Sequence, residues 1–158
     1  MSQRAVEIRP VAPGDVEHIA AHMRAADVAE VRAAGHEPAD ALRGSLARSA
    51  MAWTATVGGV PAALFGVAPL GSVLDPRAAP WLLGTDAVPR SRRALAALTP
   101  RYIREMLGAF PHLINLVHAP NTVAVAWLQR VGFSLGPTIA HPATGEPFIL
   151  FEMRRNVC

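Results

Sequence analysis

One stretch near the C-terminus decides the fold: Asn121-Thr-Val-Ala-Val-Ala-Trp-Leu-Gln-Arg-Val-Gly132-Phe133. It predicts a helix because apolar side chains recur at the spacing of one helix face, at Ala124, Trp127, Leu128 and Val131. Asn121 stands where a helix N-cap belongs, and Gly132 is a typical residue just past a helix C-terminus. The apolar run 113–118 before it predicts a buried strand. Strand and helix together form one unit that ends in Gly-Phe.

Upstream of this unit the sequence predicts a first strand, three short helices and a β-hairpin. Asp15 can cap the first helix, Gly35 ends the second, and Pro38 opens the third. Gly58-Gly59 is a two-residue turn signal between alternating strands. The expected elements are a strand at 6–11, helices from Asp15, over 26–34 and over 38–50, and strands over 51–57 and 60–67.

The remaining segments complete an alternation of strands and helices. Thr99-Pro100 looks like an N-cap followed by proline at the first helical position, so the main helix is expected to begin near Pro100. We expect a loop over 70–79 and strands over 81–85, 133–135 and 148–153, the last two joined through 136–147. The order predicts an α+β (mixed α/β) fold whose mixed sheet is covered by helices on both faces.

Composition sets the broad class. A length of 158 residues fits a single domain over 1–158. All 15 basic residues are arginine and the net charge is only +3, which is weak support for a nucleic-acid partner. The lone Cys158 cannot form an internal disulfide, so we expect a reducing compartment. Neither a signal peptide nor a membrane-spanning run is predicted.

The stretch from Asn121 to Phe133 resembles the closing signature of GNAT N-acetyltransferases, in which a strand, an Asn, an apolar helix and Gly-Phe follow one another. The whole chain more closely resembles a phage family, similar to the internal virion protein A of short-tailed coliphages. That likeness rests on segments in the same order: 30–38, the Gly58-Gly59 hairpin, 81–86, Met106-Leu107 and 121–133. The resemblance implies a GNAT-like central mixed sheet of about six to seven strands flanked by helices.

In GNAT enzymes the loop after the fourth strand carries glycines and binds the acyl-CoA pyrophosphate on backbone amides. The corresponding stretch here, 86–95, contains no glycine, and Pro89 removes one amide donor. Charge could still attract a pyrophosphate. The resemblance therefore gives as candidate cofactor-binding residues Val88, Arg90, Arg92, Arg93 and Asn121. We expect no bound cofactor, with acetyl-CoA as the cofactor if the chain is active.

The catalytic positions also depart from the family. Many members donate a proton to the leaving thiolate from a Tyr four residues before Gly-Phe, where this chain has Leu128. The only tyrosine, Tyr102, is expected to pack in the core with its hydroxyl near solvent. The candidates for a general base are Glu37, Asp86 and His118. We interpret His118 as a strand-end histidine bonded to backbone, Asp86 as a turn cap and Asn121 as an N-cap.

Three functional hypotheses follow. The first is a phage-encoded, non-catalytic GNAT-like protein in the virion or host cytoplasm, whose partners are other virion or assembly proteins. The second is an active N-acetyltransferase acting on a small amine or a protein amino group. The third, a packaging accessory that holds DNA on the Arg90–Arg93 cluster, ranks last and predicts steep salt dependence. His18 and His22 lack a third ligand, so no metal site is expected, and a homo-oligomer stays open.

Overall fold

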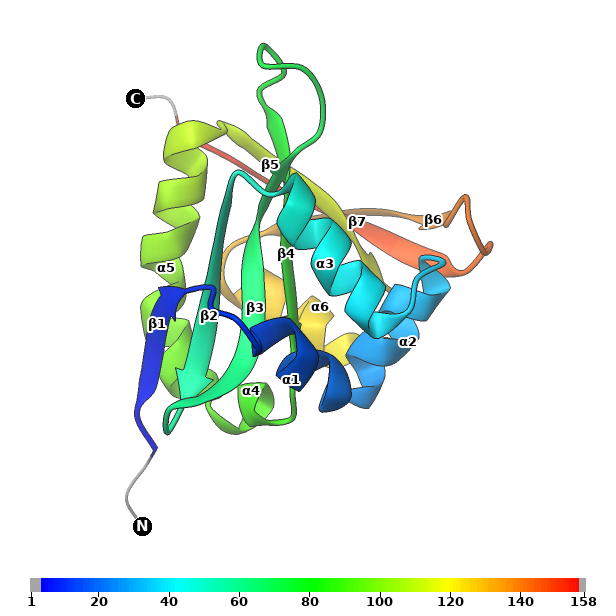
Figure 1. Ribbon diagram of the computed structural model, residues 1–158. Coiled ribbons are helices and arrows are strands. Elements are labelled where there is room, and N and C mark those ends of the chain that lie inside the picture. Colours follow the sequence, from blue (N-terminus) through cyan, green and yellow to red (C-terminus); the bar gives the residue numbers. More distant parts are fainter. Residues whose placement is uncertain (1–3, 157–158) are drawn as a thin grey trace.

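The computed structural model describes residues 4–156, so Cys158 lies outside the described residues. One mixed sheet is sandwiched between two groups of helices (Figure 1). The strands are β1 (Val6–Pro10), β2 (Met51–Val57), β3 (Val60–Pro69), β4 (Arg77–Gly84), β5 (His112–His118), β6 (Ser134–Ala140) and β7 (Pro147–Arg154). The helices are α1 (Asp15–Ala21), α2 (Ala25–Ala33), α3 (Pro38–Arg48), α4 (Ala87–Arg90), α5 (Arg92–Ala109) and α6 (Thr122–Arg130).

The sheet has seven strands in the order β1-β2-β3-β4-β5-β7-β6. Every neighbouring pair is antiparallel except β4 and β5, which are parallel. This arrangement confirms the predicted mixed sheet and the predicted alternation of strands and helices. Apart from the short helix α4, each helix had been expected from its apolar spacing or its end signals.

Alternation along β3 sends successive side chains into two different cores. Leu64 is fully buried against α1, α2 and α3 in a cluster that includes Ile19 and Leu42. Phe65 and Val67, one and three residues further along, pack on the other face against α5 and α6. A strand repeats every two residues, so the apolar run in 60–67 serves both layers at once. Both faces of the sheet are therefore covered, as the sequence predicts.

The β2–β3 hairpin forms at the predicted glycines. Gly58 and Gly59 have φ of 59° and 81°, so both central residues of the turn are left-handed. Consecutive positive φ values match the twist of two antiparallel strands and are accessible to glycine without steric cost. The two-residue turn signal in the sequence is confirmed.

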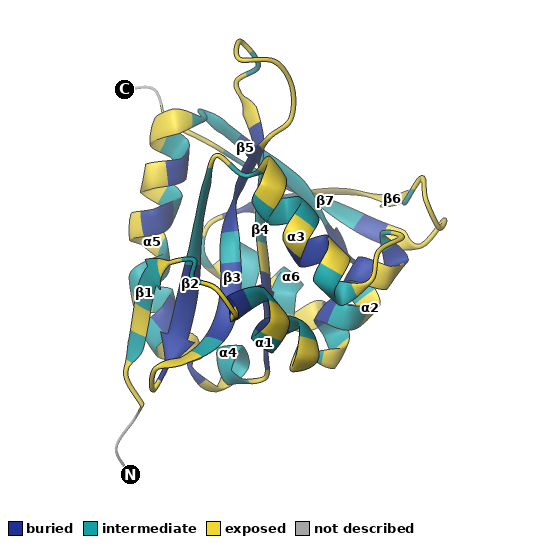
Figure 2. Ribbon diagram, in the orientation of Figure 1, coloured by how far each residue is buried: buried dark blue, intermediate teal, exposed yellow. Residues whose placement is uncertain are grey.

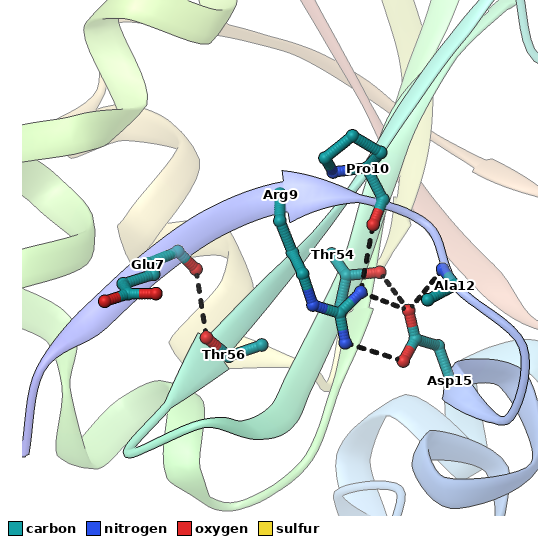
Figure 3. A network of polar contacts seen from close by, with 7 residues as sticks. All are labelled: Glu7, Arg9, Pro10, Ala12, Asp15, Thr54 and Thr56. Atoms are coloured by element: carbon teal, nitrogen blue, oxygen red, sulfur yellow. Dashed lines mark hydrogen bonds and ion pairs between the residues drawn. The ribbon is translucent and has the colours of Figure 1, made fainter.

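Asp15 ties the start of α1 to the sheet (Figure 3). Its buried carboxylate accepts hydrogen bonds from the Arg9 guanidinium at 2.8 and 2.9 Å, from the Ala12 amide at 2.8 Å and from the Thr54 hydroxyl at 2.7 Å. These donors hold the pKa of Asp15 at about 2, with the Arg9 hydrogen bond as the largest cause. Asp15 therefore acts as a buried anchor between helix and strand, whereas the sequence suggested a local cap.

The expected start of the main helix near Pro100 is wrong. Helix α5 begins at Arg92 and carries Pro100 in its interior. The preceding segment is rich in alanine and leucine, which are strong helix formers, and its Leu95 is buried against the sheet. Thr99 does not cap a helix, because its hydroxyl donates back to the Leu95 carbonyl at 2.6 Å. Tertiary packing here outweighs the local proline signal.

Three strand boundaries also differ from the prediction. The expected loop over 70–79 shrinks to 70–76 because β3 runs to Pro69 and β4 starts at Arg77. The segment 136–147 was expected to be a connection, but half of it is strand: β6 and β7 form a hairpin joined by residues 141–146. Glycine and proline in these segments suggested loops, and edge or bulge positions tolerate both residues.

Strand β6 forms one border of the sheet and is almost entirely exposed, as its yellow colour in Figure 2 shows. Its register against β7 shifts between Leu135 and Thr138, and Pro137 lies within this shift. Within residues 4–156 no helix combines the length and apolarity that a bilayer crossing requires.

Candidate functional site

The parallel strands β4 and β5 separate soon after they meet. They pair only at Arg77 with His112 and at Ala78 with Leu113. Beyond these pairs the Asn115 side chain spans the widening gap and donates to the Pro80 carbonyl at 2.9 Å. A cavity of about 710 Å³ occupies this opening. It is lined mainly by apolar side chains, among them Trp81, Leu83, Leu116, Tyr102 and Leu128.

Helix α2 closes the far end of this opening with a polar network. Asp27 accepts hydrogen bonds from the Gly84 amide at the end of β4 (3.0 Å) and from Arg24 (2.7 Å). Arg24 returns a backbone bond to the Gly84 carbonyl at 2.8 Å and donates to Asn121 at 2.9 Å. Residues of α2 and its N-cap thus bond both to the end of β4 and to Asn121 after β5, and they act as a clasp across the two strand ends. We call Arg24, Asp27, Glu30 and Asn121 the α2 clasp.

Glu30 lines the cavity together with Arg24 and Asp27 of the clasp. Its carboxylate accepts hydrogen bonds from the His118 amide at 3.0 Å and from the Asn121 side chain at 2.8 Å. Burial raises the pKa of Glu30 to about 7, and the nearby Asp27 charge adds to this rise. The two hydrogen bonds and Arg24 act in the opposite direction without overcoming it. Glu30 is therefore a carboxyl group that titrates near neutral pH beside a cavity.

Asn121 holds the predicted N-cap position of α6, but its side chain does not cap that helix. The amide instead bridges Arg24 to Glu30 and lies 3.3 Å from Asp27. The interpretation of Asn121 as an N-cap alone is wrong, because a buried amide with three charged neighbours across the sheet satisfies more polar groups than a local cap would.

His118 ends β5 as predicted and is buried. Its backbone amide binds Glu30, but its ring does not bond to backbone as expected. The ring Nε2 lies 3.5 Å from a Glu146 oxygen and is buried without a hydrogen-bond partner among the described residues. His118 is not part of the cavity lining, so its ring faces the β6–β7 turn and not the opening.

The other catalytic candidates lie apart from one another. Asp86 is exposed at the start of α4 and makes no side-chain cap, so the predicted cap is wrong, and Thr85 instead accepts the Ala87 amide at 3.3 Å. Glu37 is exposed and pairs with Arg32 at 3.2 Å. Tyr102 lines the cavity with its ring packed edge-on against Trp53 and Phe65, which confirms its expected place in the core.

The glycine-free turn after β4 differs from the expected loop because two helices fill it. In its first part the Val88 amide is used internally, donating to the Thr85 carbonyl at 3.1 Å. The start of α5 is different, because the first amides of an α-helix have no acceptor in a preceding turn of the same helix. Val88 and Arg92 line the cavity, whereas Arg90 and Arg93 are exposed outside it. The N-terminus of this eighteen-residue helix, with arginines beside it, suits a phosphate group.

Sequence reasoning missed three members of the clasp, Arg24, Asp27 and Glu30. Their charges recur every three residues from the N-cap of a short helix that is rich in alanine and valine. Such a stripe is more often solvated, so only the sheet packed against it shows that it is buried. The expectation of no metal site stays a prediction. Within residues 4–156 no three metal-ligating side chains form a group that could hold a metal ion.

Comparison with known proteins finds similarity at the level of structure. The sequence matches no family model and no curated protein. A GCN5-related N-acetyltransferase from Kribbella flavida superposes with a TM-score of 0.64 at 17% identity, covering 95% of this chain and 98% of that one. Ard1 from Thermoplasma volcanium gives 0.68 at 16% identity, with coverage of 97% and 99%.

An aminoglycoside acetyltransferase in complex with coenzyme A gives a TM-score of 0.66 at 16% identity, covering 96% of this chain and 95% of that one. These likenesses span almost the full length of both partners. Identity this low speaks for the arrangement of elements and not for the chemistry. The chain therefore has the fold of the GNAT N-acetyltransferases.

Proposed function

We propose that this chain is a phage-encoded protein that uses the GNAT fold for binding, within the virion or during its assembly, and does not transfer acetyl groups. The observation that carries the proposal is Leu128, which lines the cavity at the position where the family pattern has its proton-donating tyrosine. A leucine cannot protonate a leaving thiolate. The only tyrosine is packed between Trp53 and Phe65.

The clasp supports the same proposal. Both carboxylate oxygens of Glu30 accept hydrogen bonds from the protein, and Asp27 is likewise engaged by Gly84 and Arg24. Polar groups that satisfy one another stabilise a fixed arrangement of strands and are poorly placed to engage a substrate. Under this proposal the partners are other virion or assembly proteins, and the protein resides in the virion or the host cytoplasm. No nucleic-acid partner is proposed.

A second candidate function, N-acetyl transfer from acetyl-CoA to a small amine or a protein amino group, is favoured by one observation. Glu30, whose pKa is raised to about 7, faces the same cavity as Arg92 at the start of α5. Glu30 would take the proton from the attacking amine, and the first amides of α5 would hold the diphosphate. Acetyl-CoA supplies the thioester, and water would have to protonate the departing thiolate.

Calorimetric titration with acetyl-CoA separates the two functions. For the binding protein we expect no heat of binding up to millimolar ligand. For the enzyme we expect micromolar binding that is lost in Arg92→Ala/Arg93→Ala but kept in Arg43→Ala/Arg101→Ala, which changes two exposed arginines elsewhere. Release of free thiol in the presence of amines would overturn the first proposal. Under the second, Glu30→Gln should abolish that release while acetyl-CoA still binds.

A further inference from the structure

The loop between β3 and β4, residues 70–76, carries the most exposed apolar side chains of the described chain. Val73 and Leu74 are 103% and 92% exposed, and Leu70 is 49% exposed. The other exposed large apolar residues are scattered singly over the surface and reach at most 57%. Figure 1 shows this loop projecting beyond the end of the sheet. Two adjacent aliphatic side chains at the tip of a projection are in contact with water on all sides, which is unfavourable for a protein alone.

The loop is held in one shape by its own hydrogen bonds. The Asp75 amide donates to the Ser72 carbonyl at 2.9 Å, and the Leu70 amide to the Arg77 carbonyl at 3.2 Å. The Asp75 carboxylate accepts the Arg77 amide at 2.9 Å and the Arg77 guanidinium at 2.9 and 3.1 Å. The tip is therefore presented by a braced turn, and little ordering remains to be done when it binds.

Several arginines lie at the end of the sheet from which the loop projects. The sheet register aligns Arg77 of β4 with His112 of β5, and His112 with Arg154 of β7. Arg104 and Arg155 line a groove together with Arg154 at the same end of the sheet. Two carboxylates lie among these four arginines: Asp75 is paired with Arg77, and Glu152 contacts His112 at 2.6 Å and Arg154 at 4.0 Å. This end is therefore net positive, and Arg104 has no ion-pair partner within residues 4–156.

We propose that this end of the molecule docks reversibly on an anionic lipid bilayer, with Val73 and Leu74 entering the boundary between headgroups and acyl chains. The dimensions agree. Three residues from Leu70 to Val73 reach at most about 10 Å. The headgroup layer on each side of a bilayer is about 5–7 Å thick. With the apolar tip at the acyl boundary, the arginines at the base lie at the level of the lipid phosphates, which they attract.

A lipid surface fits better than a protein partner for two reasons. The tip is convex and isolated, so a protein would need a preformed pocket to enclose it, whereas a bilayer closes around it. The arginine groove contains no aromatic side chain for stacking on a nucleic-acid base. The inference is independent of whether the chain transfers acetyl groups, because the loop lies outside the cavity lining.

Sedimentation with vesicles tests the proposal. We expect the protein to bind vesicles of phosphatidylcholine mixed with phosphatidylglycerol several-fold better than phosphatidylcholine alone, and to be released by high salt. Val73→Ser/Leu74→Ser should weaken this binding about tenfold. Val60→Ser/Ile139→Ser, which changes two exposed apolar residues far from the loop, should bind like the unaltered protein. Arg104→Ala/Arg154→Ala should reduce the preference for phosphatidylglycerol.

A spectroscopic measurement reports the depth of the tip directly. The fluorescence of a Val73→Trp variant should shift to shorter wavelength on these vesicles, while an Ile139→Trp variant shows no vesicle-dependent change. The proposal is overturned if the protein stays in the supernatant with phosphatidylglycerol vesicles. It is also overturned if the loop variant binds as strongly as the control. Either result would favour a protein partner for this loop over a lipid surface.

Discussion

Glu30 is buried from solvent where α2 packs across the ends of β4 and β5. Its pKa rises from 4.5 to about 7, with burial as the largest cause. A carboxyl group whose pKa is higher in the folded state binds its proton more tightly there than in the unfolded chain. Its contribution to stability is fully present below pH 4.5 and is lost as the pH rises through about 7. The clasp is therefore weaker in mildly alkaline solution than in mildly acidic solution.

We predict that Glu30→Gln removes this pH dependence. In the unaltered protein the free energy of unfolding should fall by up to about 3 kcal/mol between pH 4.5 and 7, since one pKa unit corresponds to about 1.4 kcal/mol. Urea unfolding at several pH values measures the slope. Glu17→Gln, at an exposed position, serves as the control and should keep the slope. An unchanged slope in Glu30→Gln would show that other groups cause it.

At Pro100 the local sequence and the observed structure disagree, because this proline lies inside helix α5. A proline in a helix interior lacks one backbone donor and costs about 3 kcal/mol relative to alanine. Helix α5 tolerates this cost because Leu95, Tyr102 and Met106 are buried along its length. The helix is therefore held by its packing on the sheet more than by its local sequence.

We predict that Pro100→Ala raises the free energy of unfolding by about 1–3 kcal/mol, part of the gain being offset by the freer unfolded chain. Pro142→Ala should have the opposite sign. Pro142 follows His141 in a tight turn, which its fixed φ suits, and its loss should cost about 0.4–1 kcal/mol. Chemical unfolding of both variants measures the contrast. A destabilised Pro100→Ala protein would mean that α5 needs a kink at this point.

At the level of elements the sequence predicted most of the fold. Apolar spacing identified α6 and the two faces of β3, and the Gly58-Gly59 turn fixed the hairpin register. The predicted boundaries of α5 and β6 were wrong, because proline was interpreted there as a limit of the element. What could not be foreseen was the clasp, since no local pattern tells a helix that buries Asp27 and Glu30 from one that exposes them. That outcome depends on strand ends far away in the sequence.

On the scale of the molecule, the sheet consists of two antiparallel halves, β1–β4 and β5–β7, joined by only two parallel residue pairs. The α2 clasp compensates for this weak joint, because its side chains reach Gly84 on one half and His118 on the other. Asn121 is the central member, fully buried and bonded to both Arg24 and Glu30.

We predict that Asn121→Ala loosens this joint without unfolding either half. The Gly84 and His118 amides, which bond to Asp27 and Glu30, should exchange with deuterium at least about tenfold faster, because the remaining charges lose their common partner. Hydrogen exchange followed by mass spectrometry or NMR measures the effect. Gln129→Ala, exposed on the same helix, should leave both amides protected. Equal exchange in both variants would rule out a joint held by the clasp.

The border formed by β6 influences how copies of the molecule associate at high concentration. Growth of a sheet from one molecule into the next requires an even row of donors and acceptors along the free border. Pro137 interrupts that row, and the slip between Leu135 and Thr138 bends what is left of it. Pairing of β6 strands from different copies is therefore disfavoured as a way to form fibrils, even though the strand is exposed along nearly its whole length.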